Sequence, residues 1–213
     1  MKLLRQHKYA LLFVVLSFAV VLALYGKMPD PVPTHWNARG EVDGWMAKPW
    51  GALLTPLVSA GVTALLVALP RLAPKETSLD RFARVYGVIV AAIAAFLLLV
   101  TSLTSLYAVG VHVAMTNAIC AGAGALFAVL GNFFGKVTRN FFVGIRTPWT
   151  LSNDEVWLRT HRLGGKLFVG AGLVTVAASL LGHGLAALLA GAAIAAIVPA
   201  AYSYVVYRRI VGR

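Results

Sequence analysis

Six long stretches of this sequence contain no aspartate, glutamate, lysine or arginine. They cover approximately residues 9–25, 51–69, 85–109, 113–134, 167–181 and 185–207. A helix needs about 20 apolar residues to cross the roughly 30 Å hydrocarbon core of a bilayer. In each segment, apolar side chains would lie on all sides of the helix and not along one stripe. The segments therefore do not resemble the surface helices of a soluble protein. The sequence therefore predicts an all-α, polytopic membrane protein with six transmembrane helices.

The overall composition supports a membrane protein over a soluble one. Hydrophobic residues make up 60% of the 213 residues and charged residues only 12%, whereas soluble domains carry about 25% charged residues. The net charge of +12 would suggest nucleic-acid binding in a soluble protein, but here we expect the lipid bilayer as partner and no direct nucleic-acid contact. The single cysteine, Cys120, excludes an internal disulfide and a Cys-rich zinc site.

The distribution of lysine and arginine between the loops predicts the orientation. If the N-terminus is cytoplasmic, sixteen of these residues fall on the cytoplasmic side and three on the other, as the positive-inside rule requires. Six spans then place both termini in the cytoplasm. We expect residues 1–70 to form a two-helix unit and residues 71–213 a four-helix unit, within a single integrated membrane domain.

The predicted spans carry few polar side chains. Apart from His112 and His183, which lie at the outer ends of spans, we expect no ionisable residue in the membrane interior. Proton- and ion-coupled transporters usually keep a charged or ionisable group inside the membrane, so such transport is disfavoured. A pore for uncharged solutes is kept as an alternative function. The hydroxyl cluster at 101–105 is expected to bond to the carbonyls of its own helix. Small residues four apart predict close helix packing, at Gly124 and Ala128, Gly131 and Gly135, and Gly191, Ala195 and Pro199.

The predicted outer loop, residues 26–50, holds one of two informative segments. Its prolines favour extended backbone, and residues 37–44 are rich in turn formers. We expect a compact cap on the outer surface, with a recognition site formed by Pro33, His35, Trp36, Asn37, Gly40, Asp43 and Gly44. A metal-dependent enzyme that uses His35, Glu41 and Asp43 is a weaker alternative, because their spacing matches no specific metal motif. We therefore predict no enzymatic activity, metal or cofactor.

The predicted inner loop, residues 131–166, holds the second informative segment. Pro148 disfavours helix at Thr147, and the run from Ser152 to Glu155 has the pattern of a capping box. We expect a short interfacial helix from about 153 to 163, ended by a break or bend at 164–165. Glu155 would pair with Arg159 on this helix, and Trp157 with His161. The loop is either an interfacial anchor or a docking surface for a cytoplasmic partner.

Both loops resemble known sequences. The run from Asn140 to Trp157, continued by Thr160-His-Arg162 and containing Gly-Ile-Arg-Thr-Pro-Trp-Thr, closely resembles the signature of the SdpI family. Phe141 stands where we expect tyrosine in many members. The run from Pro31 to Asn37, with Gly40 and Asp43-Gly44, resembles a small uncharacterised domain often found ahead of that signature. By resemblance, the signature includes Asn140, Gly144, Arg146, Thr147, Pro148, Trp149, Trp157 and His161, and the predicted inner-loop docking site adds Asn132 and Arg162.

The SdpI family consists of immunity proteins against the sporulation-delaying cannibalism toxin. The resemblance implies a multi-pass protein of the bacterial inner membrane without known enzymatic activity. It further implies protection from a secreted membrane-active peptide on the outer face and capture of a small repressor on the cytoplasmic face. The alternative function is a small-molecule or lipid carrier, or a neutral pore of unknown substrate.

Overall fold

The computed structural model describes residues 6–72, 82–140 and 142–211. Lys2, Arg5, Lys75, Arg81 and Arg213, which entered the charge count, and Phe141, which departs from the signature, lie outside these residues. Six helices in the described part are long and apolar enough to cross a membrane. They are α2 (Lys8–Leu24), α3 (Lys48–Ala68), α4 (Ala83–Ala108), α5 (Met115–Phe134), α7 (Asp154–Leu180) and α8 (Gly184–Val211).

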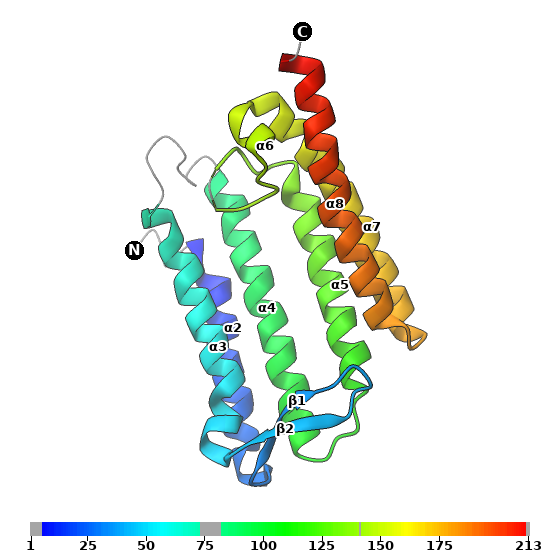
Figure 1. Ribbon diagram of the computed structural model, residues 1–213. Helices are drawn as coiled ribbons and strands as arrows, with labels where there is room; N and C mark the ends of the chain where they lie inside the picture. Colours follow the sequence, from blue (N-terminus) through cyan, green and yellow to red (C-terminus); the bar gives the residue numbers. More distant parts are fainter. Residues whose placement is uncertain (1–5, 73–81, 141, 212–213) are drawn as a thin grey trace.

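The helices form two triplets side by side (Figure 1). Helices α2, α3 and α4 pack together, as do α5, α7 and α8, and α4 and α5 form the main contact between the triplets. A two-stranded hairpin lies at one end of the bundle, which we call the hairpin end. The described chain ends lie toward the other end, together with the short helix α6 (Pro148–Ser152) and the segment 135–147. We call that segment the signature loop.

Helix α5 and helix α7 approach closely through glycines. A Cβ on Gly131 would lie 2.6 Å from the carbonyl oxygen of Gly165, and one on Gly124 would lie 2.7 Å from that of Gly172. Only glycine permits backbones to come this near, and such contacts replace the hydrophobic effect as a source of helix association in lipid. The predicted packing role of Gly124 and Gly131 is confirmed.

The hydroxyl cluster on α4 also behaves as predicted. Thr101 Oγ1 donates to the carbonyl oxygen of Leu97 at 2.9 Å, Ser102 Oγ to that of Leu98 at 2.8 Å, and Thr104 Oγ1 to that of Thr101 at 3.1 Å. Hydroxyls that bond within their own helix need no substrate to satisfy them.

The all-α prediction is wrong at the hairpin end. Strands β1 (Val32–Trp36) and β2 (Val42–Met46) form an antiparallel pair, with Val32 opposite Met46 and Trp36 opposite Val42. The prolines indicated extended backbone correctly, and residues 37–41 supply the turn, where Gly40 has a φ of 81°. Short extended segments on both sides of a turn can satisfy their backbone groups by pairing with each other, and this pairing was missed.

The prediction of a separate short helix between 153 and 163 is also wrong. These residues form the first part of α7, which continues without a break through Gly164 and Gly165. These glycines serve close contacts and not a bend: a Cβ on Gly164 would lie 2.5 Å from Ile145 Cδ1, and one on Gly165 would lie 2.6 Å from the Gly131 carbonyl oxygen.

Capping at this point differs from the prediction as well. Asn153, and not Ser152, caps α7, because its Oδ1 accepts hydrogen bonds from the backbone N–H groups of Glu155 and Val156. A capping box is present one element earlier, where Thr147 and Thr150 cap α6 reciprocally and Pro148 takes the first turn.

Candidate functional site

The hairpin end carries a network of exposed polar side chains around the turn. Asn37 Oδ1 accepts hydrogen bonds from the backbone N–H groups of Arg39 and Glu41, at 2.9 and 3.1 Å. Asn37 Nδ2 and the Arg39 guanidinium both donate to Glu41 Oε2. These bonds lower the pKa of the Glu41 carboxyl, the Asn37 bond contributing most. The hairpin tip therefore carries one connected network of exposed hydrogen bonds.

A second polar pair lies across the two strands. His35 Nδ1 lies 2.5 Å from Asp43 Oδ1, and a Cβ on Gly44 would lie 2.9 Å from His35 Cβ, so the strands are in close contact there. Glu41 interacts with Asn37 and Arg39 and does not join this pair. Within the described residues no group of three histidine, cysteine or acidic side chains could hold a metal ion, so the three residues of the metal alternative do not converge.

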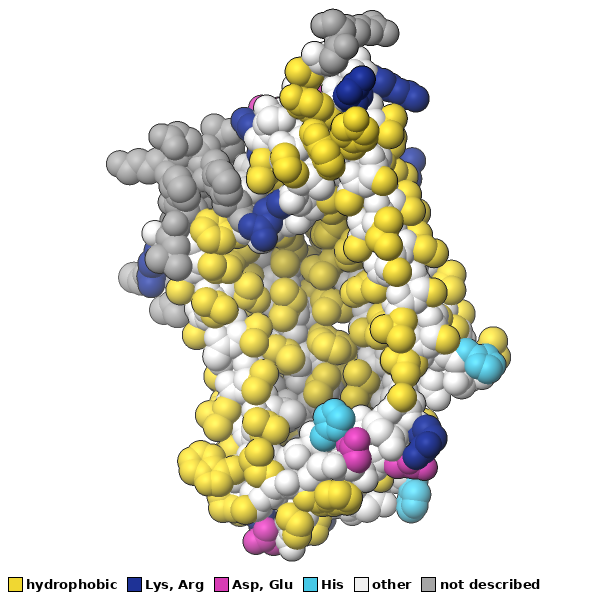
Figure 2. All heavy atoms as spheres, in the orientation of Figure 1, with side chains coloured by type: hydrophobic (Ala, Val, Ile, Leu, Met, Phe, Trp, Pro, Cys, Tyr) yellow, Lys and Arg dark blue, Asp and Glu magenta, His cyan; other side chains and the backbone are white. Residues whose placement is uncertain are grey.

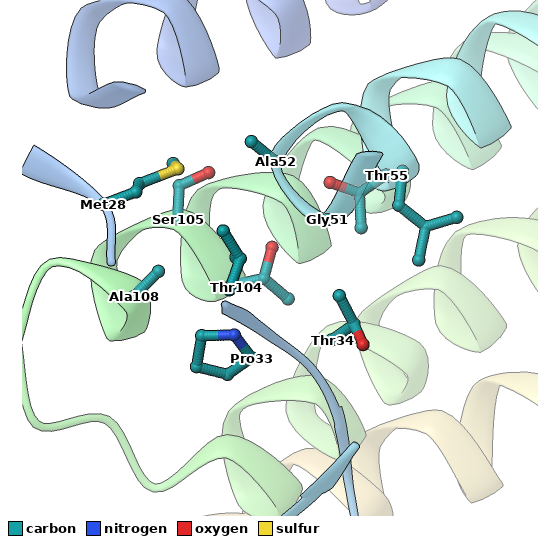
Figure 3. A pocket seen from close by; sticks show the side chains of 11 residues that line it. Met28, Pro33, Thr34, Gly51, Ala52, Thr55, Thr104, Ser105 and Ala108 are labelled. Atoms are coloured by element: carbon teal, nitrogen blue, oxygen red, sulfur yellow. The ribbon is translucent and has the colours of Figure 1, made fainter. Parts of the chain in front are cut away.

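The base of the hairpin is fastened to the helices. The Trp36 ring packs edge-on against Tyr107 of α4, with centroids 5.2 Å apart. Pro33 and Thr34 of β1 line a small cavity of about 10 Å³ with Thr55 of α3 and with Thr104 of α4 (Figure 3). The volume of this cavity is close to the space that one water molecule needs, and the threonine hydroxyls could form hydrogen bonds with such a water.

A larger cleft lies where the hairpin tip meets the other triplet. Its volume is about 500 Å³, and its lining is contributed by the tip, the start of α5, the turn between α7 and α8, and the first part of α8. Polar members of the lining are Arg39, Thr116, Asn117 and His183. Thr116 Oγ1 donates to the carbonyl oxygen of Asn37 at 3.4 Å, and Asn117 Oδ1 accepts from the Gly184 N–H. The tip is thus held against α5, which is itself joined to the start of α8, beside an accessible polar cleft.

The signature loop at the opposite end is organised by buried side chains. Asn140, fully buried, makes four hydrogen bonds to the backbone of its own loop. Its Oδ1 accepts from the N–H groups of Phe142 and Val143, and its Nδ2 donates to the carbonyl oxygens of Thr138 and Val143. A single side-chain amide therefore gives hydrogen-bond partners to backbone N–H and carbonyl groups that have none in regular secondary structure.

His161 of α7 fastens the same loop from below. Its Nε2 accepts a hydrogen bond from the Ile145 N–H at 3.0 Å, so the proton resides on Nδ1, which lies 2.8 Å from the carbonyl oxygen of Trp157. Gly144 has a φ of 119°, and a Cβ there would overlap His161 Nε2. Trp157 stacks on His161 and donates Nε1–H to the Val137 carbonyl oxygen at 2.7 Å. The predicted pairing of Trp157 with His161 is confirmed.

Thr147 joins the loop to α6 and to the last helix. Its Oγ1 lies 2.9 Å from Ser203 Oγ of α8, and Trp149 packs on Tyr204 of the same helix. Thr150, fully buried, donates to the carbonyl oxygen of Ile145 at 2.9 Å. Thr150 was missed as a site residue although it belongs to the Gly-Ile-Arg-Thr-Pro-Trp-Thr run. Ser203 gave no signal, because it is 56 positions away from its partner.

Three further predicted residues are exposed, unlike the buried members of this cluster. Asn132 is exposed on α5, and Arg146 and Arg162 are exposed at the same end. Arg159 pairs with Glu155 at 2.6 Å, as predicted, and Arg139 pairs with Asp154 at 2.7 Å. Lysine and arginine gather at this end on the face drawn in Figure 2, whereas histidines and acidic residues mark the hairpin end. The two ends therefore offer different chemistry to partners.

Two known sequence families match the two regions just described. The SdpI/YfhL protein family matches residues 136–203, and a domain of unknown function, DUF1648, matches residues 12–60. The immunity protein SdpI of Bacillus subtilis (strain 168) is 23% identical over 170 residues, which cover 80% of this chain and 79% of that protein. No solved structure matches the chain. The chain belongs to the SdpI/YfhL family, carries an N-terminal DUF1648 domain, and is a distant homologue of the immunity protein SdpI.

Proposed function

We propose that this protein is an immunity protein of the bacterial inner membrane that protects the cell from a secreted, membrane-active peptide. The single observation that carries the proposal is the position of the two matched regions. The two regions contain polar sites at opposite ends of one six-helix bundle. The named relative of this chain is an immunity protein. Such an arrangement suits a protein that meets one partner on each side of a membrane.

The hairpin end is the proposed contact for the peptide. The charge distribution in the sequence favours the outer side for it. The cleft of about 500 Å³ offers Arg39 and His183 as polar and basic contacts and apolar helix surface beside them. A concave site with few polar groups among apolar ones is the usual form of a recognition site.

The signature-loop end is the proposed docking surface for a small cytoplasmic repressor. Buried hydrogen bonds fix the backbone of the loop, while Arg159 and Arg162 remain exposed beside it. A rigid scaffold that presents arginines can recognise acidic groups with a small loss of conformational entropy.

Survival of toxin-sensitive cells that express the protein tests the proposal. Cells with the wild-type protein should survive a peptide dose that kills control cells. The His183→Ala change should reduce the tolerated dose about tenfold, as for loss of one anchor contact in a binding site. His112→Ala is the matched control, because His112 is exposed at the same end but does not line the cleft.

Two results would contradict the proposal. If cells with wild-type levels of the protein in their membranes gain no protection from any membrane-active peptide tested, the protein is not an immunity protein. If His112→Ala and His183→Ala reduce protection equally, the cleft is not the contact site.

A further inference from the structure

An apolar cavity of about 470 Å³ lies directly beneath the signature loop. Its walls come from both helix triplets and its roof from residues 142–145 of the loop. Among the lining side chains are Leu66 of α3, Ile89 and Ile93 of α4, Leu130 of α5 and Ala196 of α8. The site lies where the two triplets part, and Figure 2 shows the face of the molecule hollowed between α3 and α8. Neither the proposed peptide cleft nor the proposed repressor surface uses this cavity.

The chemistry of the lining selects an apolar occupant. None of the lining residues carries a charge, and the Tyr86 hydroxyl already donates to the carbonyl oxygen of Leu66. A water molecule in such a space would lack hydrogen bonds, because it needs two to four polar partners. An empty space would forfeit the dispersion contacts of every group that lines it. A hydrocarbon chain from the surrounding membrane satisfies both conditions.

The size of the cavity excludes a helix as occupant. A membrane-spanning helix about 10 Å wide and 30 Å long occupies roughly 2,000 Å³, several times the volume available. A toxin helix or a helix from a second copy of this chain therefore cannot fill it. A lipid chain is narrow enough to enter laterally from the gap between the triplets.

The rim of the cavity has the opposite character to its interior. Arg146 directly follows the roof residue Ile145 and is exposed. Arg139 and Arg162 are exposed at the same end of the bundle. A guanidinium has five N–H donors, so Arg146 can serve a phosphate in addition to another partner. Positive charge above an apolar cavity complements a molecule with an anionic head and an apolar tail.

We propose that the cavity beneath the signature loop binds one acyl chain of an anionic phospholipid, whose phosphate group interacts with Arg146. The loop backbone then serves as the cover of a lipid site as well as a scaffold for protein docking. Gly144 and Ile145 contribute to this cover. The signature run therefore has a role in lipid binding in addition to protein docking.

Photo-cross-linking of the full-length protein in phosphatidylcholine vesicles tests the proposal. The vesicles contain a small fraction of phosphatidylglycerol or of phosphatidylcholine with the same photoreactive group on one acyl chain, and adducts are mapped by mass spectrometry. We expect adducts concentrated on Ile89, Ile93 and Leu130, about fivefold more with phosphatidylglycerol, the effect of one basic residue near an anionic head group.

Variants separate the tail site from the head-group site. Ala196→Phe should reduce the cavity adducts about tenfold by filling the space, whereas Ala201→Phe, exposed on a different face of α8, should leave them unchanged. Arg146→Gln should abolish the preference for phosphatidylglycerol, and Arg146→Lys should restore most of it. Circular dichroism and thermal unfolding of each variant confirm that it is folded.

Three outcomes would overturn the proposal. Adducts spread evenly over the lipid-facing helices would show that the cavity holds no lipid. Equal yields with both lipids, unchanged by Arg146→Gln, would show that no anionic head group is recognised. Equal effects of Ala196→Phe and Ala201→Phe would show that the adducts do not arise in the cavity. Protection from the peptide is not part of this readout, so failure here leaves the proposed function unaffected.

Discussion

The hairpin end and the signature loop are both non-helical segments that connect helices, yet they are stabilised in opposite ways. At the hairpin end, charged side chains pair with each other on the surface: the side chains of Arg39 and Glu41 are 79% and 58% exposed. In the signature loop, neutral side chains bond to backbone in the interior, and Asn140, Thr150 and His161 are completely buried. Exposed pairs contribute about 0–1 kcal/mol, whereas each buried group left unpaired costs about 1–3 kcal/mol.

The difference indicates how each end can work. A loop fixed by buried hydrogen bonds offers a partner one constant shape. A tip held by exposed ion pairs can rearrange at little energetic cost when a ligand binds. We infer that the signature loop is the rigid site and the hairpin tip the adaptable one, and the following changes are expected to produce progressively smaller effects.

The largest effect is expected from Gly144→Ala. The new Cβ would meet His161 Nε2, and its backbone would need a φ of 119°, so the free energy of unfolding should fall by about 3 kcal/mol. Thermal unfolding in detergent micelles measures this loss. Gly182→Ala is the control, because Gly182 also has a positive φ but has nothing within 4 Å, and a decrease of only about 1 kcal/mol is expected. Equal losses would show that His161 does not hold the loop.

Asn140→Ala should be the next most damaging change. It removes four hydrogen bonds from a buried turn, and a loss of about 2–3 kcal/mol is expected. Asn140→Asp keeps the acceptor for the N–H groups of Phe142 and Val143, but it places a buried carboxylate oxygen against the carbonyl oxygens of Thr138 and Val143, so it should be at least as destabilising near neutral pH. Thermal unfolding compares the two. If Asn140→Ala is as stable as the wild-type protein, the side chain does not organise the loop.

Asp43→Asn should have a small effect on stability. The His35 and Asp43 side chains are 72% and 43% exposed, and removing one charge from such a pair changes stability by less than about 1 kcal/mol. Protease cleavage between the strands measures local opening of the hairpin. A loss as large as that of Asn140→Ala would contradict the contrast between the two ends.

Acid should loosen the hairpin tip without unfolding the bundle. The pKa of Glu41 is lowered from its ordinary value of 4.5 by its bonds to Asn37 and Arg39. Stabilisation by Glu41 is therefore present above pH 4.5 and is lost as the pH falls through the lowered pKa. The protection factors of the Arg39 and Glu41 amides against hydrogen exchange, which correct for the intrinsic pH dependence of exchange, should fall below pH 4.5 in the wild-type protein, because both amides donate to Asn37. In Glu41→Gln these protection factors should be independent of pH over this range.

The long helices could be predicted from the sequence because membrane spans obey a one-dimensional rule of length and apolar content. Local pairs could be predicted as well: Glu155 with Arg159 and Trp157 with His161 are one helical turn apart. The glycines at 164–165 could not, because the same residue type ends a helix or admits a neighbouring backbone. Only the position of Gly131 and Ile145 in space decides between these roles.

The candidate sites were predictable in part. The hairpin pair of His35 and Asp43 and the loop residues Asn140, Gly144, Trp157 and His161 were identified from two local motifs, and the structure brings each group together. Thr116, His183 and Ser203 were not identified. They reach their sites from segments that are distant in the sequence, and local sequence patterns do not reveal which helices become neighbours.

The most direct test of the account asks whether the two ends perform separate tasks. Cells that express the wild-type protein, His183→Ala, or the double change Arg159→Gln and Arg162→Gln are exposed to the membrane-active peptide, and both survival and membrane recruitment of a candidate repressor are measured. We predict that the hairpin-end variant loses protection, and that the signature-end variant retains protection but loses recruitment. Loss of both activities in the signature-end variant, at wild-type membrane levels, would contradict a division of tasks between the ends.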